Sequence, residues 1–132
     1  MTRYAIDDAT VLRLLEENVA PHARYQLVAP AVVRSEVLAT LFAAVRSGTL
    51  SEKEARLRLE RLAELKMRLL GDRVSRVTAW KIAMEAGWPR VGPAEYLAVA
   101  VLQADALVTE NEQLVSAAAE RVPIAGFETL FR

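Results

Sequence analysis

The segment from Tyr4 to Leu12 constrains the fold most, because it joins a short apolar stretch to a helical pattern through two consecutive acids. Residues 3–6 have the composition of a buried strand, and Asp7 and Asp8 follow at its carboxyl end. Buried carboxylates are destabilising unless they are paired. In open α/β sheets, ligands bind at the carboxyl ends of the strands. The segment therefore predicts an α/β chain with a ligand site at this junction.

The rest of the chain alternates between short apolar runs and longer helical patterns. Further strands are expected at residues 27–29, 106–109 and 123–127. Helices are expected from Thr10 as N-cap, and over residues 31–46, 51–70, 74–86, 94–104 and 110–120. Strands that alternate with helices indicate a mostly parallel sheet of four or five strands, with helices on both faces. Trp80 is expected in the core.

Length and composition limit the kinds of site that the chain can carry. The 132 residues, of which 53% are hydrophobic, predict a single domain, residues 1–132. Without cysteine and with His22 alone, a metal would need oxygen ligands, as Mg²⁺, Mn²⁺ and Ca²⁺ do. The apolar runs are too short to span a membrane, and the early acids do not fit a signal peptide. A cytoplasmic protein is expected.

Side-chain oxygens recur at three further places in this pattern. These are Glu36 in the helix after the second strand, Glu95 in the helix over residues 94–104, and the run Glu110-Asn111-Glu112 after the strand at 106–109. Parallel strands place their carboxyl ends on one edge, so the first acids and those of 110–112 share a rim. Clustered carboxylates repel unless a cation or protons neutralise them. Magnesium or manganese would do so, and the chemistry predicted is metal-assisted phosphodiester hydrolysis.

Each of these acids also has a purely structural explanation. Asp8 can cap the first helix. Glu95, Glu110 and Glu112 fall in first turns of helices, where acids stabilise the positive end of the helix dipole. Glu36 can be a solvated surface residue. The order and context of all of them together therefore matter more than any single one.

Four segments, taken in order, resemble the motifs of PIN-domain proteins of the VapC toxin type. They are Ile6-Asp-Asp-Ala-Thr-Val-Leu12, Ala29–Leu38 with its Ser-Glu-Val-Leu, Ala94-Glu-Tyr-Leu-Ala-Val-Ala100, and Asp105-Ala-Leu-Val-Thr109 with the polar pair that follows. The resemblance covers the whole chain and implies one PIN-like domain, a three-layer α/β/α sandwich. It also implies Mg²⁺- or Mn²⁺-dependent endoribonuclease activity on RNA, homodimers, and a cognate antitoxin whose C-terminal segment blocks the site.

The resemblance also implies roles for particular residues. The implied set comprises Asp7, Glu36 and Asn111 as catalytic residues, these three with Asp8 and Glu95 as metal ligands, and Thr10, Thr109 and Glu112 in support. The alternative for Thr109 is that it simply ends its strand, where a Thr is common without function. Both Asp7 and Asp8 fit the first motif, and Asp7 is preferred because it ends the strand in register with Tyr4.

The chain departs from the family pattern at two positions. Pro93 stands where the third motif has an Asp, and Asn111 stands where the fourth motif has one. Asn can coordinate a hard cation but adds no charge, and Glu95 lies roughly 200° round the helix from position 93. The alternative function is therefore a catalytically weakened PIN-fold module that binds RNA or a partner protein. A phosphoacceptor receiver domain is rejected, because no late Lys follows a strand; the last is Lys81.

The basic side chains are unevenly distributed. Nine of the 17 Lys and Arg residues fall between Lys53 and Lys81, although the formal net charge is zero. Such a local excess can meet RNA phosphates or an acidic partner segment. A solvated helix face with i,i+4 ion pairs is the simpler interpretation.

Overall fold

The computed structural model describes all residues, 1–132, and is built on a five-stranded, all-parallel sheet. The strands are β1 (Arg3–Ile6), β2 (Gln26–Pro30), β3 (Arg68–Leu70), β4 (Ala106–Val108) and β5 (Ile124–Ala125). Their order across the sheet is β3-β2-β1-β4-β5, which places β1 at the centre. The predicted α/β class with a parallel sheet is confirmed, and at least one helix joins each strand to the next.

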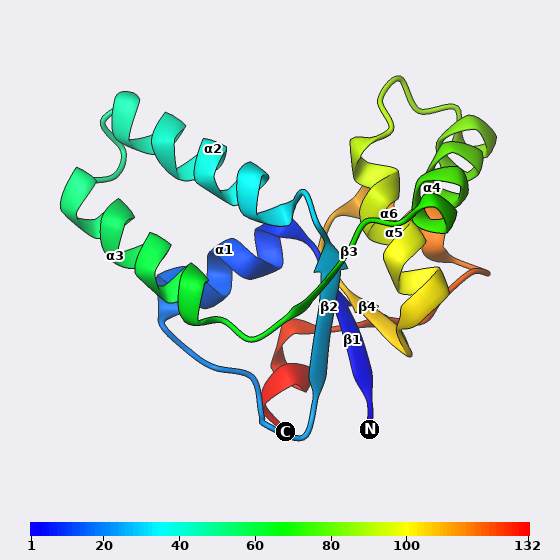
Figure 1. The fold of residues 1–132 in the computed structure, drawn as a ribbon, viewed down its shortest axis with the longest axis horizontal. Helices are drawn as coiled ribbons and strands as arrows, with labels where there is room; N and C mark the ends of the chain where they lie inside the picture. Colours follow the sequence, from blue (N-terminus) through cyan, green and yellow to red (C-terminus); the bar gives the residue numbers. More distant parts are fainter.

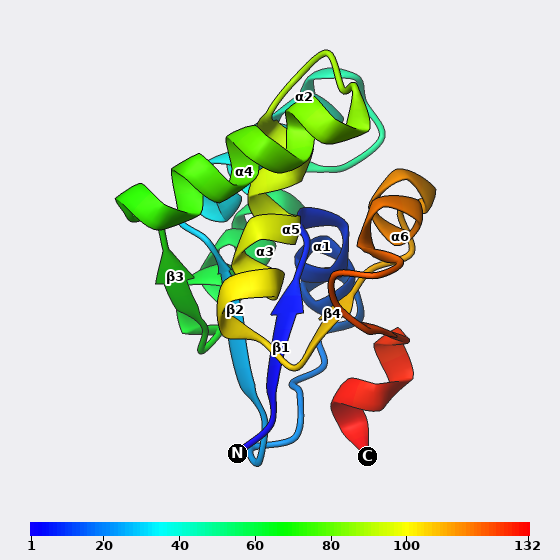
Figure 2. The same ribbon diagram turned by 90° about the vertical axis from the view of Figure 1, so that its right-hand side faces the viewer.

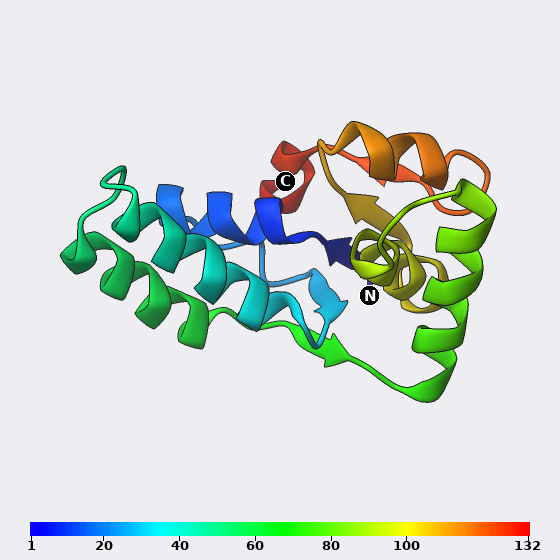
Figure 3. The same ribbon diagram turned by 90° about the horizontal axis from the view of Figure 1, so that it is seen from above.

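Helices cover both faces of the sheet, as expected for a three-layer sandwich (Figure 1). One layer contains α1 (Asp8–Glu17), α2 (Val33–Arg46) and α3 (Glu52–Glu64). The other contains α4 (Arg73–Ala86), α5 (Gly92–Gln103) and α6 (Glu112–Ala118), and a 3₁₀ helix, η1 (Phe127–Phe131), ends the chain. Seen from above, α2 and α3 form a hairpin that extends away from the sheet alongside α1 (Figure 3). None of the helices combines the length and the hydropathy that a membrane crossing requires.

The core lies between the sheet and the two helical layers. Ala5 and Ile6 of β1 are fully buried, as are Leu97 and Ala98 of α5. The nearly all-round apolar sequence of α5 therefore matches its position, packed on β1 and β2 with α4 and α6 beside it. This packing fixes the central strand, and with it the acids at its end.

The structure corrects three local expectations. The helix expected over 51–70 ends at Glu64, and residues 68–70 form β3, because Arg68 and Leu70 pair in register with Val28 and Pro30 of β2. The last strand is only two residues long, and the chain turns into η1 at Phe127. Trp80 is not in the core: 66% of it is exposed on α4.

Candidate functional site

The strand order reverses between β1 and β4, and the acids of the first motif lie at that point. From β1 the chain proceeds outward to β2 and β3, and then crosses back to β4 on the other side of β1. Such a switch point opens a crevice at the carboxyl ends of the two strands. Ile6 pairs in register with Val108, so Asp7 and Thr109, the next residues on each strand, lie side by side there.

Asp7 is 2% exposed, and hydrogen bonds engage both of its carboxylate oxygens. Its Oδ1 accepts from the Thr10 amide at 2.9 Å and from Thr10 Oγ1 at 2.6 Å. Its Oδ2 accepts from Thr109 Oγ1 at 2.5 Å. The bond to the Thr10 amide makes Asp7 the N-cap of α1. The expectations that Thr10 or Asp8 is the cap were therefore wrong: Thr10 donates to the cap, and Asp8 is the first residue of the helix.

The network continues from Thr109 into the fourth motif. Thr109 Oγ1 accepts from the Asn111 amide at 3.0 Å, while Asn111 Oδ1 accepts from the Leu114 amide at 3.1 Å. Asn111 is therefore the N-cap of α6. Its amide oxygen, which is the atom that could coordinate a cation, already satisfies the helix terminus with one of its two lone pairs.

A second carboxylate is held across the two helical layers. Glu36, in the first turn of α2, accepts a hydrogen bond of 2.8 Å at its Oε1 from the hydroxyl of Tyr96 on α5. Burial raises the pKa of Tyr96, as do this hydrogen bond and the negative charges of Asp8, Glu36 and Asp7. Tyr96 therefore remains a neutral donor, and the acids of the first and second motifs lie near one phenol.

Glu95 joins this group from the start of α5. Burial raises the pKa of Glu95, and the charge of Glu36 raises it further. Glu95 and Glu36 therefore repel each other at a half-buried rim without a cation between them. The charges of Asp7, Asp8 and Glu36 thus act on Tyr96, and that of Glu36 acts on Glu95. The role of these acids as metal ligands stays a prediction.

The remaining predicted residues lie differently. Glu110 is exposed and forms an ion pair of 3.2 Å with Arg13 of α1. Glu112 is exposed in the first turn of α6, where the helix dipole explains an acid. Pro93 occupies the first turn of α5 and offers no side-chain ligand. Tyr96 is the residue that sequence reasoning missed; it belongs to the quoted Ala-Glu-Tyr triplet, but nothing in the sequence shows that it reaches Glu36.

The oxygen donors fit a hard cation that keeps much of its own water. No group of three or more Asp, Glu, His or Cys side chains is close enough together to hold a metal ion. Magnesium usually retains several waters and binds through one or two carboxylates. Asp8, Glu36 and Glu95 are half-buried at the rim and could supply such a pair, while Asp7 is committed to hydroxyl and amide donors.

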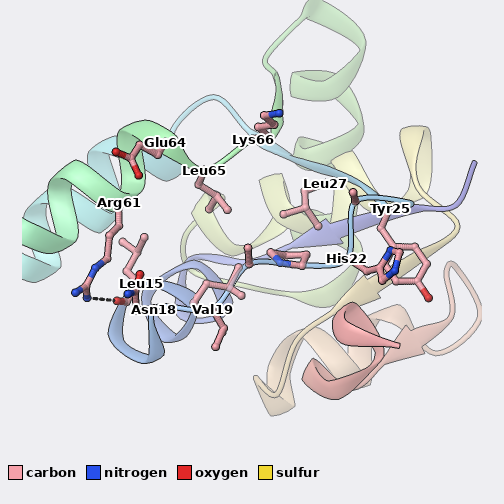
Figure 4. Close-up of a pocket in the computed structure, with 14 residues that line it drawn as sticks. Leu15, Asn18, Val19, His22, Tyr25, Leu27, Arg61, Glu64, Leu65 and Lys66 are labelled. Atoms are coloured by element: carbon pink, nitrogen blue, oxygen red, sulfur yellow. Dashed lines mark hydrogen bonds between the residues drawn. The ribbon is translucent and has the colours of Figure 1, made fainter.

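A cavity of about 470 Å³ lies at the carboxyl end of α1, away from the acids at its start (Figure 4). It is enclosed by the end of α1, the segment 18–25, the start of β2 and the end of α3. The bond of 2.9 Å from Arg61 Nη1 to the Leu15 carbonyl ties two of these elements together. Because α1 begins at the acids and ends at this cavity, the length of the helix separates the cavity from the acids.

Solved structures share this fold. The crystal structure of PAE2754 from Pyrobaculum aerophilum superposes with a TM-score of 0.73 at 19% identity, over 98% of this chain and 92% of that chain. VapBC2 from Rickettsia felis, bound to a DNA fragment from their promoter, gives 0.64 at 9% identity, over 95% and 98%. VapBC-1 from nontypeable Haemophilus influenzae gives 0.58 at 14% identity, over 96% and 98%. No protein-family profile and no curated protein sequence matches the chain. The likeness to VapBC structures confirms the expected PIN-like fold.

Proposed function

We propose that the protein is a metal-dependent endoribonuclease and the toxin of a VapBC-like toxin–antitoxin pair. The observation that carries the proposal is the gathering of Asp7, Asp8 and Glu36 around the buried phenol of Tyr96. This group lies at the switch point of a fold shared with VapBC structures. Partly buried acids at such a point favour a cation and an anionic substrate over a neutral ligand.

In this proposal, one acid fixes the geometry of the site and the others bind the metal ion. Asp7 aligns the end of β1 with that of β4 through Thr10 and Thr109. Glu36 and Asp8, with Glu95 beside them, would hold Mg²⁺ or Mn²⁺, and Asn111 has one lone pair left to contribute. A bound ion would supply a more acidic water and charge for the leaving oxygen of a phosphodiester. The Tyr96 hydroxyl binds Oε1 of Glu36, and Oε2 of Glu36 would then be the oxygen that binds the ion.

The same proposal includes partners and location. The similarity to VapBC structures supports a cognate antitoxin as protein partner and a cytoplasmic place of action. A homodimer is supported by α4, which carries four exposed apolar side chains at helical spacing: Val74, Val77, Trp80 and Met84. An exposed stripe of this kind is typical of a protein interface, and the matching stripe of a second copy would cover it.

Calorimetry with Mn²⁺ and RNA cleavage with and without EDTA test the proposal. We expect Mn²⁺ binding and EDTA-sensitive cleavage, both reduced by Glu36→Gln and Glu95→Gln. Glu60→Gln is the matched control, because Glu60 is exposed on α3 and forms no ion pair. Cleavage that EDTA leaves unchanged, or that all three variants retain, would exclude the metal site described above.

A catalytically weakened module is the second candidate, and specific observations favour it. Pro93 offers no ligand, and Asn111 is uncharged and already caps α6. In that case RNA or the antitoxin would bind without cleavage, and Mn²⁺ would bind weakly or not at all. Measuring RNA binding and RNA cleavage on the same preparation separates the two candidates.

A further inference from the structure

The basic stretch between Lys53 and Lys81 divides into two parts that differ in charge balance. On α3 the cations are matched by acids. Lys53 and Arg56 share a hollow with Glu52 and Glu60. Arg58 and Arg61 lie 3.2 Å and 3.7 Å from the same carboxylate oxygen of Glu54. This half is the solvated helix face that the simpler interpretation of the sequence predicts.

The cations beside β3 are less closely matched, although Lys66 also lines the cavity of Figure 4 together with Glu64. Arg34, Lys66 and Arg68 line a hollow of about 590 Å³ that contains no acidic side chain. None of the three forms an ion pair, and neither do Arg73 and Arg76 at the start of α4. The unbalanced charge is therefore concentrated along one edge of the sheet.

The single acid within this part of the chain is committed to a structural role. Asp72 is the only Asp or Glu between Leu65 and Met84. Its Oδ1 accepts from the amide and the hydroxyl of Ser75, both at 2.8 Å, and so caps α4. The hydrogen bonds from Ser75 lower the pKa of Asp72, and the charge of Arg76 lowers it further, so this one acid offsets part of the charge of Arg76 and leaves Lys66 and Arg68 unmatched.

These cations follow a path toward the candidate site. β3 is the edge strand of the sheet and leads directly into α4 (Figures 2 and 3). The Ala31 amide donates to the Leu70 carbonyl at 2.8 Å, so the end of β3 lies beside the segment that enters α2. α2 carries Arg34, which lines the hollow, and Glu36 two residues later, which meets Tyr96. The hollow and the acidic rim are thus joined through the first turn of one helix.

We infer that the phosphate backbone of a single-stranded RNA lies along β3, held by Arg34, Lys66 and Arg68, and passes the start of α4 to the rim that carries Glu36. The inference rests on the proposed function, because it assigns the path of that substrate. Lys66 and Arg68 are two residues apart on an extended segment, about 6.6 Å, and can meet successive charges of a polymer. Tyr25, Leu65 and Met67 also line the hollow and give the bases an apolar surface, a combination typical of single-strand binding.

Binding of a fluorescein-labelled 12-nucleotide RNA, followed by anisotropy in EDTA at several salt concentrations, tests the path without requiring cleavage. The variant is Lys66→Gln/Arg68→Gln, and the matched control is Lys53→Gln/Arg56→Gln on α3. Each phosphate contact contributes about 0.7 to the slope of log K against log salt concentration for a single strand. We expect the slope to fall by about 1.4 in the variant. The control should keep the wild-type slope, and equal urea midpoints of the three proteins show that all are folded.

Each other outcome overturns the inference. Equal slopes for the variant and the wild type would show that β3 does not carry the RNA, and cleavage by the wild type in Mg²⁺ would still uphold the proposed function. An equal loss in the control would assign RNA binding to the whole basic stretch. If the wild type binds a polyglutamate peptide in the same assay but not RNA, and the variant loses that binding, the surface serves an acidic protein segment.

Discussion

The two hydrogen-bonded carboxylates of the site, Asp7 and Glu36, differ in how firmly they are held. Asp7 accepts three hydrogen bonds from residues close to it in space, two of them from a single residue, Thr10. Glu36 is half-buried and accepts one, from Tyr96. Burial raises the pKa of Glu95, and the negative charge of Glu36 raises it further.

The difference separates a carboxylate that holds the fold from carboxylates that are available to a ligand. A buried acid with all its oxygens engaged is part of the structure and gains little from a cation. A pair of acids that repel each other is destabilised until something neutralises it. We therefore expect stability to depend mainly on Asp7, and metal binding to depend mainly on Glu36 and Glu95.

The largest expected effect is that of Asp7→Ala on stability. The change removes the cap of α1, which costs about 1 kcal/mol, and leaves the buried Thr109 hydroxyl without its acceptor, while the Thr10 hydroxyl keeps only the Val108 carbonyl at 3.1 Å. We expect the free energy of unfolding in urea to fall by about 3 kcal/mol.

Asp8→Ala is the matched control for this change. Asp8 lies in the first turn of α1, where an acid contributes less than about 1 kcal/mol through the helix dipole. If the two variants were equally stable, the contrast between Asp7 and the other acids would be wrong.

The sequence predicted most of the fold because its signals were local. The strand at residues 3–6, the buried helix α5 and the alternation of strands and helices follow from apolar patterning and caps. β3 was not predictable in this way. Residues 68–70 continue a helical pattern, and they form a strand only because β2 offers an edge about 40 residues earlier in the chain. Tertiary pairing outweighs local propensity there.

The site was predictable as a set of acids but not as a network. Parallel strands place Asp7 and the end of β4 on one edge, and the sequence was sufficient to expect this. The partners of these acids are 102 residues away for Asp7 with Thr109, and 60 residues away for Glu36 with Tyr96. No local spacing indicates such contacts. Asn111 as a metal ligand stays a prediction, and what the structure shows is that Asn111 caps α6.

Tyr96→Phe tests how firmly Glu36 is held. The change removes a partly buried hydrogen bond to a charged group, and we expect a loss of about 1.5 kcal/mol in the free energy of unfolding. In a double-mutant cycle with Glu36→Ala, a coupling energy of about 1 kcal/mol is expected if the bond forms in solution. Tyr4→Phe also loses one phenolic hydroxyl, but that hydroxyl forms no hydrogen bond to these acids, so the change should cost less than about 0.5 kcal/mol. A coupling energy of zero would contradict the link between α2 and α5.

Glu95→Gln has the smallest expected effect, and its sign is the informative part. Because the pKa of Glu95 is raised in the folded protein, the folded state binds more protons than the unfolded state above the ordinary value of 4.5. The contribution of Glu95 to stability therefore falls as the pH rises from 4.5 through the raised pKa of the folded protein.

Below this pH range Glu95 is protonated in both the folded and the unfolded state, and the variant and the wild type should differ in stability by a constant amount. At pH 7 the variant should gain a few tenths of a kcal/mol relative to that baseline, since solvent still screens the charge of a half-buried group. Urea unfolding at pH 4 and pH 7 measures the gain, and saturating Mg²⁺ should abolish it if the ion neutralises the same pair. A gain of the opposite sign would mean that Glu95 is stabilised by a neighbouring charge, and the two kinds of carboxylate would no longer differ.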